Sequence, residues 1–506
     1  MREDSLTPVI VGVGEIKDRP ADRAAGQEPA ALIEAALRGA EADSGAALLG
    51  RLDSLDLVNV ISWPYDDLPA LLADRVGAAP RWRRHGEIGG HTPVQFLHEA
   101  AARIARGEAS VAAVCGGEAS HTATWARRSG TALGWTRPER MPLPTGGDWL
   151  PARNRDYIHG LARRHGITEP ISVYPLYENA TAAAWRQSPA EARAESAELW
   201  SALSRVAADN PIAWLTTPVD PRTVATEGAA NRMIAWPYPK LMVANPAVNQ
   251  AAAVLLTSLA VARAAGIPDR RLVFLHAGAS AQEPRDWMAR PRLDESPAQE
   301  AVLRAMVGAA GAGGLGLMEL YTCFPVVPKM ARRVLGLSGS APISVTGGLT
   351  FHGAPFNSFM MHAAAAMVRR LREGDDAARG LLYGQGGHLT AHHALLLGRD
   401  AAVAGAMLRP SDVNAIAAAN RDPPPAVVED SCGPARLETY TILFNPDGSV
   451  ARGTAVLRMD DGARTLAMIP AEDSATLGLL MALDAGAVGH QGQLVPGRDG
   501  LDRWVA

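Results

Sequence analysis

Cysteine is scarce in this chain. Its 506 residues include only Cys115, Cys323 and Cys432. Three cysteines in so long a chain exclude a disulfide framework and are typical of a protein in a reducing compartment.

Long apolar runs are also missing. No stretch of 18 residues is free of charge or strong polar interruption, so no membrane span is expected. The strand-like run Val9–Gly14 near the start is too short for a signal peptide. A net charge of -4 argues against a nucleic-acid partner, which would need a basic surface. We therefore expect a cytoplasmic protein without membrane or nucleic-acid contacts.

The sequence lacks the motifs of several common enzyme classes in the structural setting that each motif requires. No G-x-S-x-G lies in a strand–turn–helix setting, which disfavours a serine hydrolase. The glycine-rich loops form neither a P-loop nor a dinucleotide fingerprint, because Gly12-Val13-Gly14 lacks a third glycine at the right offset.

The chain does contain alternating strand and helix patterns, and its length suggests two or three domains. Such alternation predicts an α/β fold with parallel sheets between helices, and similar spacing in the two halves indicates an internal duplication. The predicted strands are Val9–Gly14, Leu55–Val60, Val111–Cys115, Arg271–Ala277, Gly314–Thr322, Ile343–Thr346 and Leu381–Tyr383. The predicted helices are Pro29–Leu37, Leu68–Val76, Pro93–Arg106, Ala298–Ala309, Pro325–Leu335 and Phe356–Arg372.

The middle of the chain differs in amino-acid composition from the two halves. Tryptophan, arginine and proline crowd residues 125–175, followed by short helical Ala180–Arg186 and long polar Pro189–Ala208. The second helix begins at a capping box with Ser188 as its first residue. This insertion is either a binding lid over the first half or a solvated helical excursion.

The tail beyond Asp422-Pro423-Pro424-Pro425 is β-rich. Predicted strands Thr439–Phe444, Val450–Met459 and Arg464–Ile469 are joined by Pro-Asp-Gly and Asp-Asp-Gly turns, as in a small barrel or meander. From Pro425 onward there are 11 acidic residues against 6 arginines, a net charge of -5. An oligonucleotide-binding-type (OB-like) barrel with this charge lacks a basic groove, so packing or binding of a protein partner is expected.

The most distinctive segment of the first half is a predicted helix start at residues 89–95. In Gly89-Gly90-His91-Thr92-Pro93-Val94-Gln95, Thr92 is predicted as N-cap, with Pro93 at the first helical position and Gln95 in a capping box. Such a start leaves backbone N–H groups unpaired and carries the positive end of the helix dipole, and the two glycines would let another chain segment or a ligand come close to it.

This helix and its surroundings resemble the nucleophile segment of the thiolase superfamily. The resemblance covers roughly residues 5–405 and rests on Ile104, Gly107, Gly116-Gly117-Glu118, Trp236–Lys240 and Val248–Ala253, besides three glycine-rich loops. It implies a duplicated fold of two βαβαβαββ halves in five α-β-α-β-α layers. The implied domains are 1–121 with 237–265, an insertion at 122–236, a second half at 266–408, a linker at 409–425 and an OB-like barrel at 426–506.

The resemblance also implies where catalytic groups would stand. Thiolases use a cysteine thiolate, an activating histidine, a second cysteine and an oxyanion hole. In this chain the nucleophile position falls on Gly90, the histidine on Ala354 and the second cysteine on Tyr383. The oxyanion-loop position falls on Tyr321, which either donates one hydrogen bond or plugs the pocket.

These losses and the barrel-like tail narrow the resemblance to thiolase-like proteins of type 1. That family implies a pseudoenzyme of lipid or acyl-CoA metabolism that binds CoA or acyl-CoA without thiolysis or Claisen condensation, requires no cofactor, and is a monomer or homodimer. The alternative is an active acetyl-CoA acetyltransferase-type acyltransferase using surrogate residues. The candidate pocket residues are His91, Thr92, Tyr321, Cys323, His352, Gln385 and His388.

A metal site is disfavoured at His388, His392 and His393. A strand over Ala391–Leu397 would point the last two to opposite faces, and no acidic residue or cysteine completes the set.

Overall fold

The computed structural model describes residues 6–139, 154–311, 314–374, 379–403, 405–409, 411–429, 431–497 and 500–506. The N-terminal Met1–Ser5 and part of the tryptophan- and arginine-rich segment, residues 140–153, lie outside the described residues. Within the described ranges, none of the helices has the length and apolarity that crossing a bilayer requires.

The two halves form one nine-stranded sheet in the order β3-β2-β4-β7-β1-β8-β11-β10-β9. The first half contains β1 (Pro8–Lys17), α1 (Pro29–Ser44), β2 (Ser54–Leu57), α2 (Leu68–Arg75), β3 (Trp82–His85), α3 (Thr92–Ala105), β4 (Val111–Ala119), α4 (Ser120–Ser129), β7 (Asn249–Ser258) and α9 (Leu259–Ala264). The second contains β8 (Val273–Gln282), α10 (Pro297–Ala310), β9 (Leu317–Glu319), α11 (Val326–Leu335), α12 (Gly348–Phe351), α13 (Phe359–Glu373), β10 (Arg379–Gly386), β11 (Ala391–Gly398) and α14 (Asn414–Ala419).

The strand order repeats in the two halves, as the duplication predicted. In each half the first strand (β1 or β8) pairs antiparallel with the last (β7 or β11), which pairs antiparallel with the strand before it in that half (β4 or β10). That strand pairs parallel with the second, β2 or β9. The halves meet where Val9 and Ile10 of β1 pair with Phe274 and Val273 of β8.

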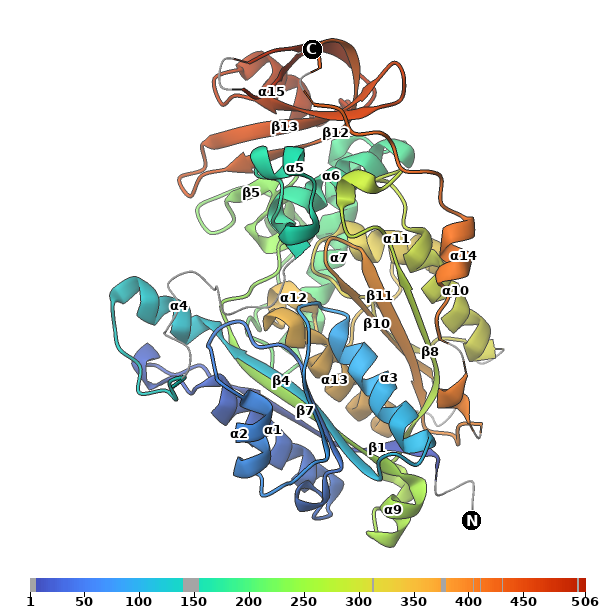
Figure 1. Ribbon diagram of the computed structural model, residues 1–506. Coiled ribbons are helices and arrows are strands. Elements are labelled where there is room, and N and C mark those ends of the chain that lie inside the picture. The colour runs from blue at the N-terminus through green and yellow to red at the C-terminus, as the bar shows by residue number, and fades with distance from the viewer. Residues whose placement is uncertain are drawn as a thin grey trace.

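The helices and the two halves of the sheet stack in five α-β-α-β-α layers (Figure 1). Helices α3 and α13 lie in the middle and contact strands of both halves, while α1 and α10 cover the outer faces. All nine residues of β4 are buried, because helices cover both of its faces. A Cβ on Gly12 or Gly14 of β1 would overlap carbonyl oxygens of α1, so these glycines allow close helix–strand packing.

The insertion is helical and lies between core and tail (Figure 1). It contains α5 (Gly160–Arg164), α6 (Pro170–Ala184), α7 (Pro189–Ala208), α8 (Pro221–Ala225), β5 (Met233–Trp236) and β6 (Tyr238–Pro239). The capping box at Ser188 is present, and α7 has the predicted bounds.

The tail forms a closed barrel of five strands. It contains β12 (Gly433–Phe444), β13 (Val450–Met459), β14 (Arg464–Ile469), α15 (Ser474–Leu480), β15 (Gln491–Val495) and β16 (Arg503–Val505). The sheet order β13-β14-β16-β15-β12 closes through pairing of β13 with β12, and β5 and β6 extend it beyond β12. The barrel has its own apolar core, which includes Met233 and Trp236 from the insertion.

Two local predictions were wrong. Helix α3 begins at Thr92, not after it. The Thr92 hydroxyl donates to the Gly89 carbonyl (2.7 Å) and Gln95 donates to Glu99 (2.7 Å), so no capping box forms. Residues 343–346 form no strand, because the N–H groups of Val345 and Thr346 donate to the buried Glu319 carboxylate instead of to a neighbouring strand.

Candidate functional site

A cavity of about 560 Å³ lies where the two halves and the insertion meet. Gly89 and Gly90 line it at the start of α3, Tyr174 comes from α6, and the second half contributes the Tyr321, Ala354 and Gln385 loops. Most of the remaining lining is aliphatic or aromatic. The glycine-rich loops that the sequence singled out therefore converge on one apolar chamber.

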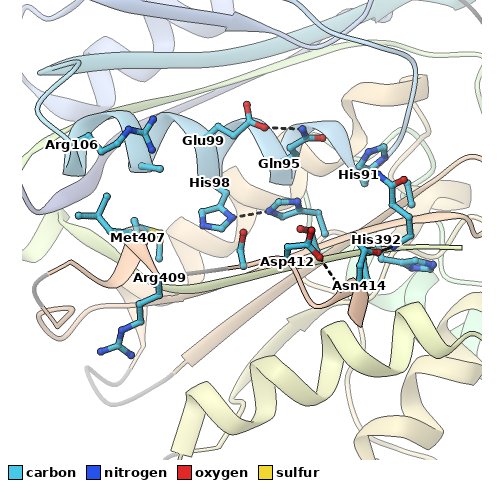
Figure 2. Close-up of a pocket in the computed structure, with 18 residues that line it drawn as sticks. His91, Gln95, His98, Glu99, Arg106, His392, Met407, Arg409, Asp412 and Asn414 are labelled. Atoms are coloured by element: carbon cyan, nitrogen blue, oxygen red, sulfur yellow. Dashed lines mark hydrogen bonds between the residues drawn. The ribbon is translucent and has the colours of Figure 1, made fainter. Parts of the chain in front are cut away.

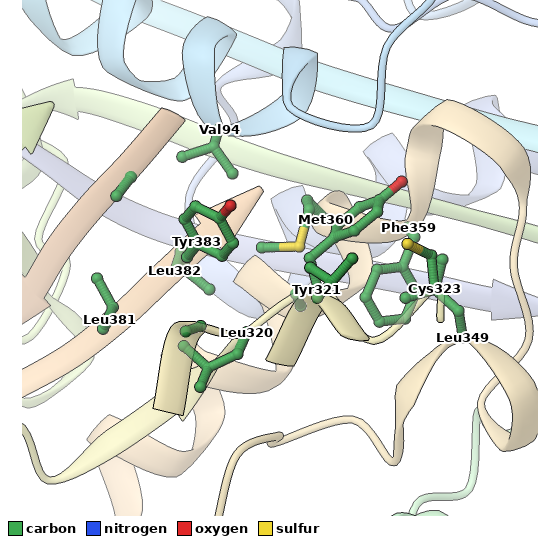
Figure 3. Close-up of a cluster of buried hydrophobic side chains, with 14 of the residues drawn as sticks. Val94, Leu320, Tyr321, Cys323, Leu349, Phe359, Met360, Leu381, Leu382 and Tyr383 are labelled. Atoms are coloured by element: carbon green, nitrogen blue, oxygen red, sulfur yellow. The ribbon is translucent and has the colours of Figure 1, made fainter. Parts of the chain in front are cut away.

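At the nucleophile position, the space next to Gly90 is filled. A Cβ on Gly90 would overlap the hydroxyl of Tyr321 and would lie 2.6 Å from the backbone oxygen of Gln385. Figure 3 shows the Tyr321 ring rising from the loop after β9, with its hydroxyl toward the loop that leads into α3. Because the Gln385 contact is with backbone, a side chain at position 90 cannot be accommodated by rotating Tyr321 alone.

Tyr321 adopts an unusual backbone conformation to reach this place. Its φ angle is 53°, in the left-handed region that few residues other than glycine adopt. Its side chain is buried, and burial raises the pKa of the phenol, so the hydroxyl stays neutral. The neutral phenol supplies one hydrogen-bond donor at the start of α3 but no base.

The position of the activating histidine also lacks a titratable group. Ala354 lines the cavity with a methyl group. His352 does not line it. That imidazole is fully buried elsewhere, with Nδ1 3.3 Å from the Asn210 amide nitrogen, and burial lowers its pKa to about 3.

Tyr383 faces away from the cavity. Its hydroxyl accepts a hydrogen bond from Gln299 (3.0 Å) and lies 2.7 Å from Nδ1 of His392 on β11. Figure 3 shows its ring separate from that of Tyr321. Gln385, two residues further along at the end of β10, lines the chamber instead.

Gln385 forms the polar centre of the cavity. Its amide nitrogen donates to the Tyr174 hydroxyl (2.7 Å) and to Sγ of Cys323 (3.2 Å). Its carbonyl oxygen Oε1 is buried without a hydrogen-bond partner. A buried amide oxygen without a hydrogen-bond partner is costly.

Cys323 and His388 also line the chamber. Burial raises the pKa of the Cys323 thiol to about 12, and burial lowers the pKa of His388 to about 3. The thiol is therefore protonated near neutral pH, and the imidazole is neutral. Since a thiolate is the nucleophilic form of cysteine, Cys323 is poorly activated for acyl transfer.

His91 and Thr92 lie outside this chamber. Thr92 is bonded within the helix start, and His91 lines a second cavity of about 540 Å³ along one face of α3. Figure 2 shows this face opposite β11 and the segment around Asp412. Burial lowers the pKa of His91 to about 4. His392 and His393 both line this second cavity; His393 bonds to His98 (2.9 Å), and His392 bonds to Tyr383.

Tyr174 is a cavity residue that sequence reasoning missed. It lies in the part of α6 that precedes the predicted Ala180–Arg186 helix, in a segment with Pro170 and Pro175. Its ring stacks on Phe324, with centroids 4.5 Å apart. Prolines at 170 and 175 masked the helical pattern, and because every residue from Ser172 to Ala182 is buried, no alternation of polar and apolar faces marks the helix.

Comparison with known proteins connects this geometry to a family. Residues 416–496 match the family described as thiolase-like protein type 1 additional C-terminal domain. A monomeric SCP2-thiolase-like protein type 1 from Mycobacterium smegmatis is 27% identical with a TM-score of 0.79, covering 99% of both chains. No curated protein sequence matches the chain.

Two thiolases share the fold at lower identity. The dimeric peroxisomal thiolase of Saccharomyces cerevisiae is 12% identical, and the Acat5 thiolase of Ascaris suum, solved in complex with coenzyme A, is 14% identical. Each has a TM-score of 0.56 over 78% of this chain, covering 98% and 99% of the two thiolases respectively. The C-terminal domain and the match over the whole chain together support a thiolase-like protein of type 1 with the additional C-terminal domain.

Proposed function

We propose that this protein holds an acyl-CoA-type ligand without covalent catalysis, in a pathway of lipid or acyl-CoA metabolism. The observation that carries the proposal is the Tyr321 hydroxyl, which fills the space of a nucleophile at position 90 while an apolar chamber stays open beside it. Among the described residues that line the chamber, none presents a thiolate or a basic imidazole that would accept the acyl chain covalently.

The chamber fits a mostly apolar ligand segment with one polar end. Ile61, Ile88 and Ile171 give apolar walls, whereas Gln385 is a polar lining residue whose buried Oε1 has no hydrogen-bond partner. An acyl chain would bury its methylenes against these walls, at about 0.8 kcal/mol for each CH₂. The amide N–H groups of the pantetheine arm of CoA are donors suited to Gln385.

The direct test is calorimetric titration with CoA and with octanoyl-CoA, using a variant that fills the chamber. Ala244→Trp places an indole in the lining, whereas Ala247→Trp places it on an exposed part of the same loop outside the lining. Ala244→Trp is expected to weaken binding about tenfold or more, while Ala247→Trp leaves it unchanged. Equal binding by both variants would contradict a ligand role for the chamber.

A second measurement separates binding from acyl transfer. Intact mass after incubation with octanoyl-CoA is expected to show no added acyl group, and acetoacetyl-CoA is expected to persist in the presence of CoA. A stable adduct on Cys323 or His388 would instead support the acyltransferase alternative, with a surrogate nucleophile in the chamber.

A further inference from the structure

The second cavity, of about 540 Å³ along one face of α3, has a pair of buried histidines in its wall. His98 of α3 and His393 of β11 are each only 6% exposed, and Nδ1 of His98 lies 2.9 Å from Nε2 of His393 (Figure 2). Within the described part of the chain, neither ring makes another hydrogen bond. Nε2 of His98 and Nδ1 of His393 are therefore left for a ligand in the cavity, because polar atoms in a protein interior are costly when they stay unpaired.

The pair presents one hydrogen-bond donor and one acceptor to such a ligand. Burial lowers the pKa of His98 to about 4 and the pKa of His393 well below its usual range, so both rings are neutral near pH 7. Two neutral imidazoles carry two protons, and one of these lies in the N–H···N bond between them. Whichever ring donates that bond, one of the two remaining nitrogens carries a proton and the other carries a lone pair.

Two serine hydroxyls lie beside the histidine pair. Ser280 of β8 is opposite His393 in the register of the sheet, and its backbone N–H and C=O bond on the other side to Ser411 (2.7 Å) and Val413 (2.9 Å). Ser280 and His393 are therefore a non-hydrogen-bonded pair, in which the two side chains project from the same face and lie close together. Ser280 and Ser411 both line the cavity, and their hydroxyls make no hydrogen bond to the described residues.

The charged side chains on the α3 wall are already occupied by protein partners. Glu99 accepts hydrogen bonds from Gln95 (2.7 Å) and Arg84 (2.5 Å). Arg106 donates to both carboxylate oxygens of Glu108 (2.8 Å each). Neither charge on this wall is left to attract a ligand of the opposite sign.

We propose that the second cavity binds a small neutral polyol or sugar. The unpaired groups along it are uncharged: the histidine pair, the two serine hydroxyls, Oε1 of Gln95 and Nδ2 of Asn414. A hydroxyl both donates and accepts, so a polyol matches this mixed set whichever way the shared imidazole proton lies. Arg409 and Asp412, both exposed at the rim, carry opposite charges and favour neither an anion nor a cation.

The size of the cavity agrees with this class of ligand, since small-molecule sites span about 300–1,000 Å³. Ala102 and Met407 give apolar patches against which the carbon skeleton of a polyol would pack. The inference does not rest on acyl-CoA binding, because the second cavity and the chamber have no lining residue in common.

The experiment is titration of the full-length protein with glycerol, D-ribose, D-glucose and myo-inositol by calorimetry. Concentrations up to about 50 mM allow dissociation constants in the millimolar range to be measured. At least one of the four is expected to bind with one-to-one stoichiometry, whereas citrate and choline, as anionic and cationic probes, are expected not to bind.

A double variant, Ser280→Ala with Ser411→Ala, removes both hydroxyls without adding bulk. It is expected to weaken polyol binding about tenfold, because two hydrogen bonds to the ligand are lost. Ala244→Trp, which fills the chamber and not the second cavity, is the matched control and should leave polyol binding unchanged. Octanoyl-CoA binding should respond in the opposite way, with an effect of Ala244→Trp and none of the serine variant.

Histidine ring spectra supply a readout of the pair itself. With ¹⁵N-labelled histidine, the bound polyol should shift the ring nitrogen signals of His98 and His393, which His98→Gln and His393→Gln would assign. Absence of binding by all four polyols, or preferential binding of citrate or choline, would overturn the proposal. Polyol binding that leaves both ring signals in place, or that persists unweakened in a folded serine variant, would overturn it as well.

Discussion

At the scale of single residues, Gly90 and Tyr321 depend on each other. A methyl group at position 90 would overlap the Tyr321 hydroxyl and approach the Gln385 backbone oxygen at 2.6 Å. Gly90→Ala is therefore expected to destabilise the protein by about 1–3 kcal/mol through overpacking. Urea unfolding would measure the loss.

Gly134→Ala is the matched control, because a Cβ there meets nothing within 4 Å. Combining Gly90→Ala with Tyr321→Ala should recover only part of the overpacking cost, since the backbone contact persists. Equal stability of Gly90→Ala and Gly134→Ala would show that the start of α3 has more room than the structure indicates.

The carboxyl group of Glu319 makes a pH-dependent contribution to stability. Burial raises its pKa to about 7, although hydrogen bonds from Ser344 and Thr346 partly oppose the shift. The folded state then holds a proton that the unfolded state loses near pH 4.5. Its stabilising contribution is largest below pH 4.5 and declines by about 1.4 kcal/mol per pH unit until pH 7.

Glu319→Gln removes this titration while keeping the acceptor, because Oε2 takes all the hydrogen bonds and Oε1 has none. The free energy of unfolding between pH 5 and pH 7 is expected to fall less steeply in the variant. Glu198→Gln, at an exposed site on α7, should leave the slope as it is. An identical slope in Glu319→Gln and the natural protein would refute the assignment.

Matching to the thiolase motifs identified cavity residues that hold a fixed position within a motif loop, such as Gly90, Tyr321 and Ala354. They could not find Tyr174, which belongs to the insertion and reaches the chamber through tertiary contacts with Phe324 and Gln385. Nor could they connect His98 with His393, which lie 295 positions apart and meet because α3 packs on β11.

At the scale of elements, a buried ion pair joins the insertion to the second half. Lys329 of α11 donates to Glu178 of α6 and to the Ser196 hydroxyl of α7 (3.1 Å), and both charges are almost fully buried. Lys329→Met leaves the Glu178 charge without its partner, so a loss of about 3–5 kcal/mol is expected. Thermal and urea unfolding would measure it.

The double variant Lys329→Met with Glu178→Gln is the control. The amide oxygen that Glu178→Gln introduces can still accept from the Tyr238 hydroxyl, which in the natural protein donates to the carboxylate at 2.7 Å. Stability close to that of the natural protein is expected. If the double variant is as unstable as Lys329→Met, packing of the lysine stem and not charge holds these helices together.

Element bounds were predictable where the ends carry local signals. The capping box at Ser188 fixed α7, and the turns at Asp447-Gly448 and Asp461-Gly462 fixed β13 and β14. The strand predicted at 343–346 failed because its backbone donors go to Glu319, a partner that no local pattern indicates.

At the scale of the whole molecule, the insertion extends the sheet of the barrel and contributes to its core. Ile442 and Leu443 of β12 pair with Trp236 and Ala235 of β5, and Asn179 of α6 donates to the Tyr440 carbonyl (2.9 Å). A chain ending at residue 424 would expose Met233, Trp236 and an unpaired strand edge. We expect it to aggregate, as measured by light scattering and soluble yield.

Supplying residues 425–506 as a separate chain should restore solubility, because it returns the missing strand partner. A monodisperse 1–424 chain with the thermal midpoint of the full protein would contradict this expectation. The sequence predicted the linker and the barrel but not the pairing of β5 with β12. Met233–Trp236 is only four residues long, and so short a strand carries no pattern that indicates its partner.

The shared sheet also has a consequence during synthesis. Trp236 leaves the ribosome roughly two hundred residues before its partner Ile442, a delay of about 10–40 seconds at ordinary translation rates. Throughout that interval the edge of β5 that pairs with β12 in the folded protein has no partner, although β6 can pair with its other edge. Chaperone occupancy on the growing polypeptide should therefore peak after β5 emerges and fall once β12 is made.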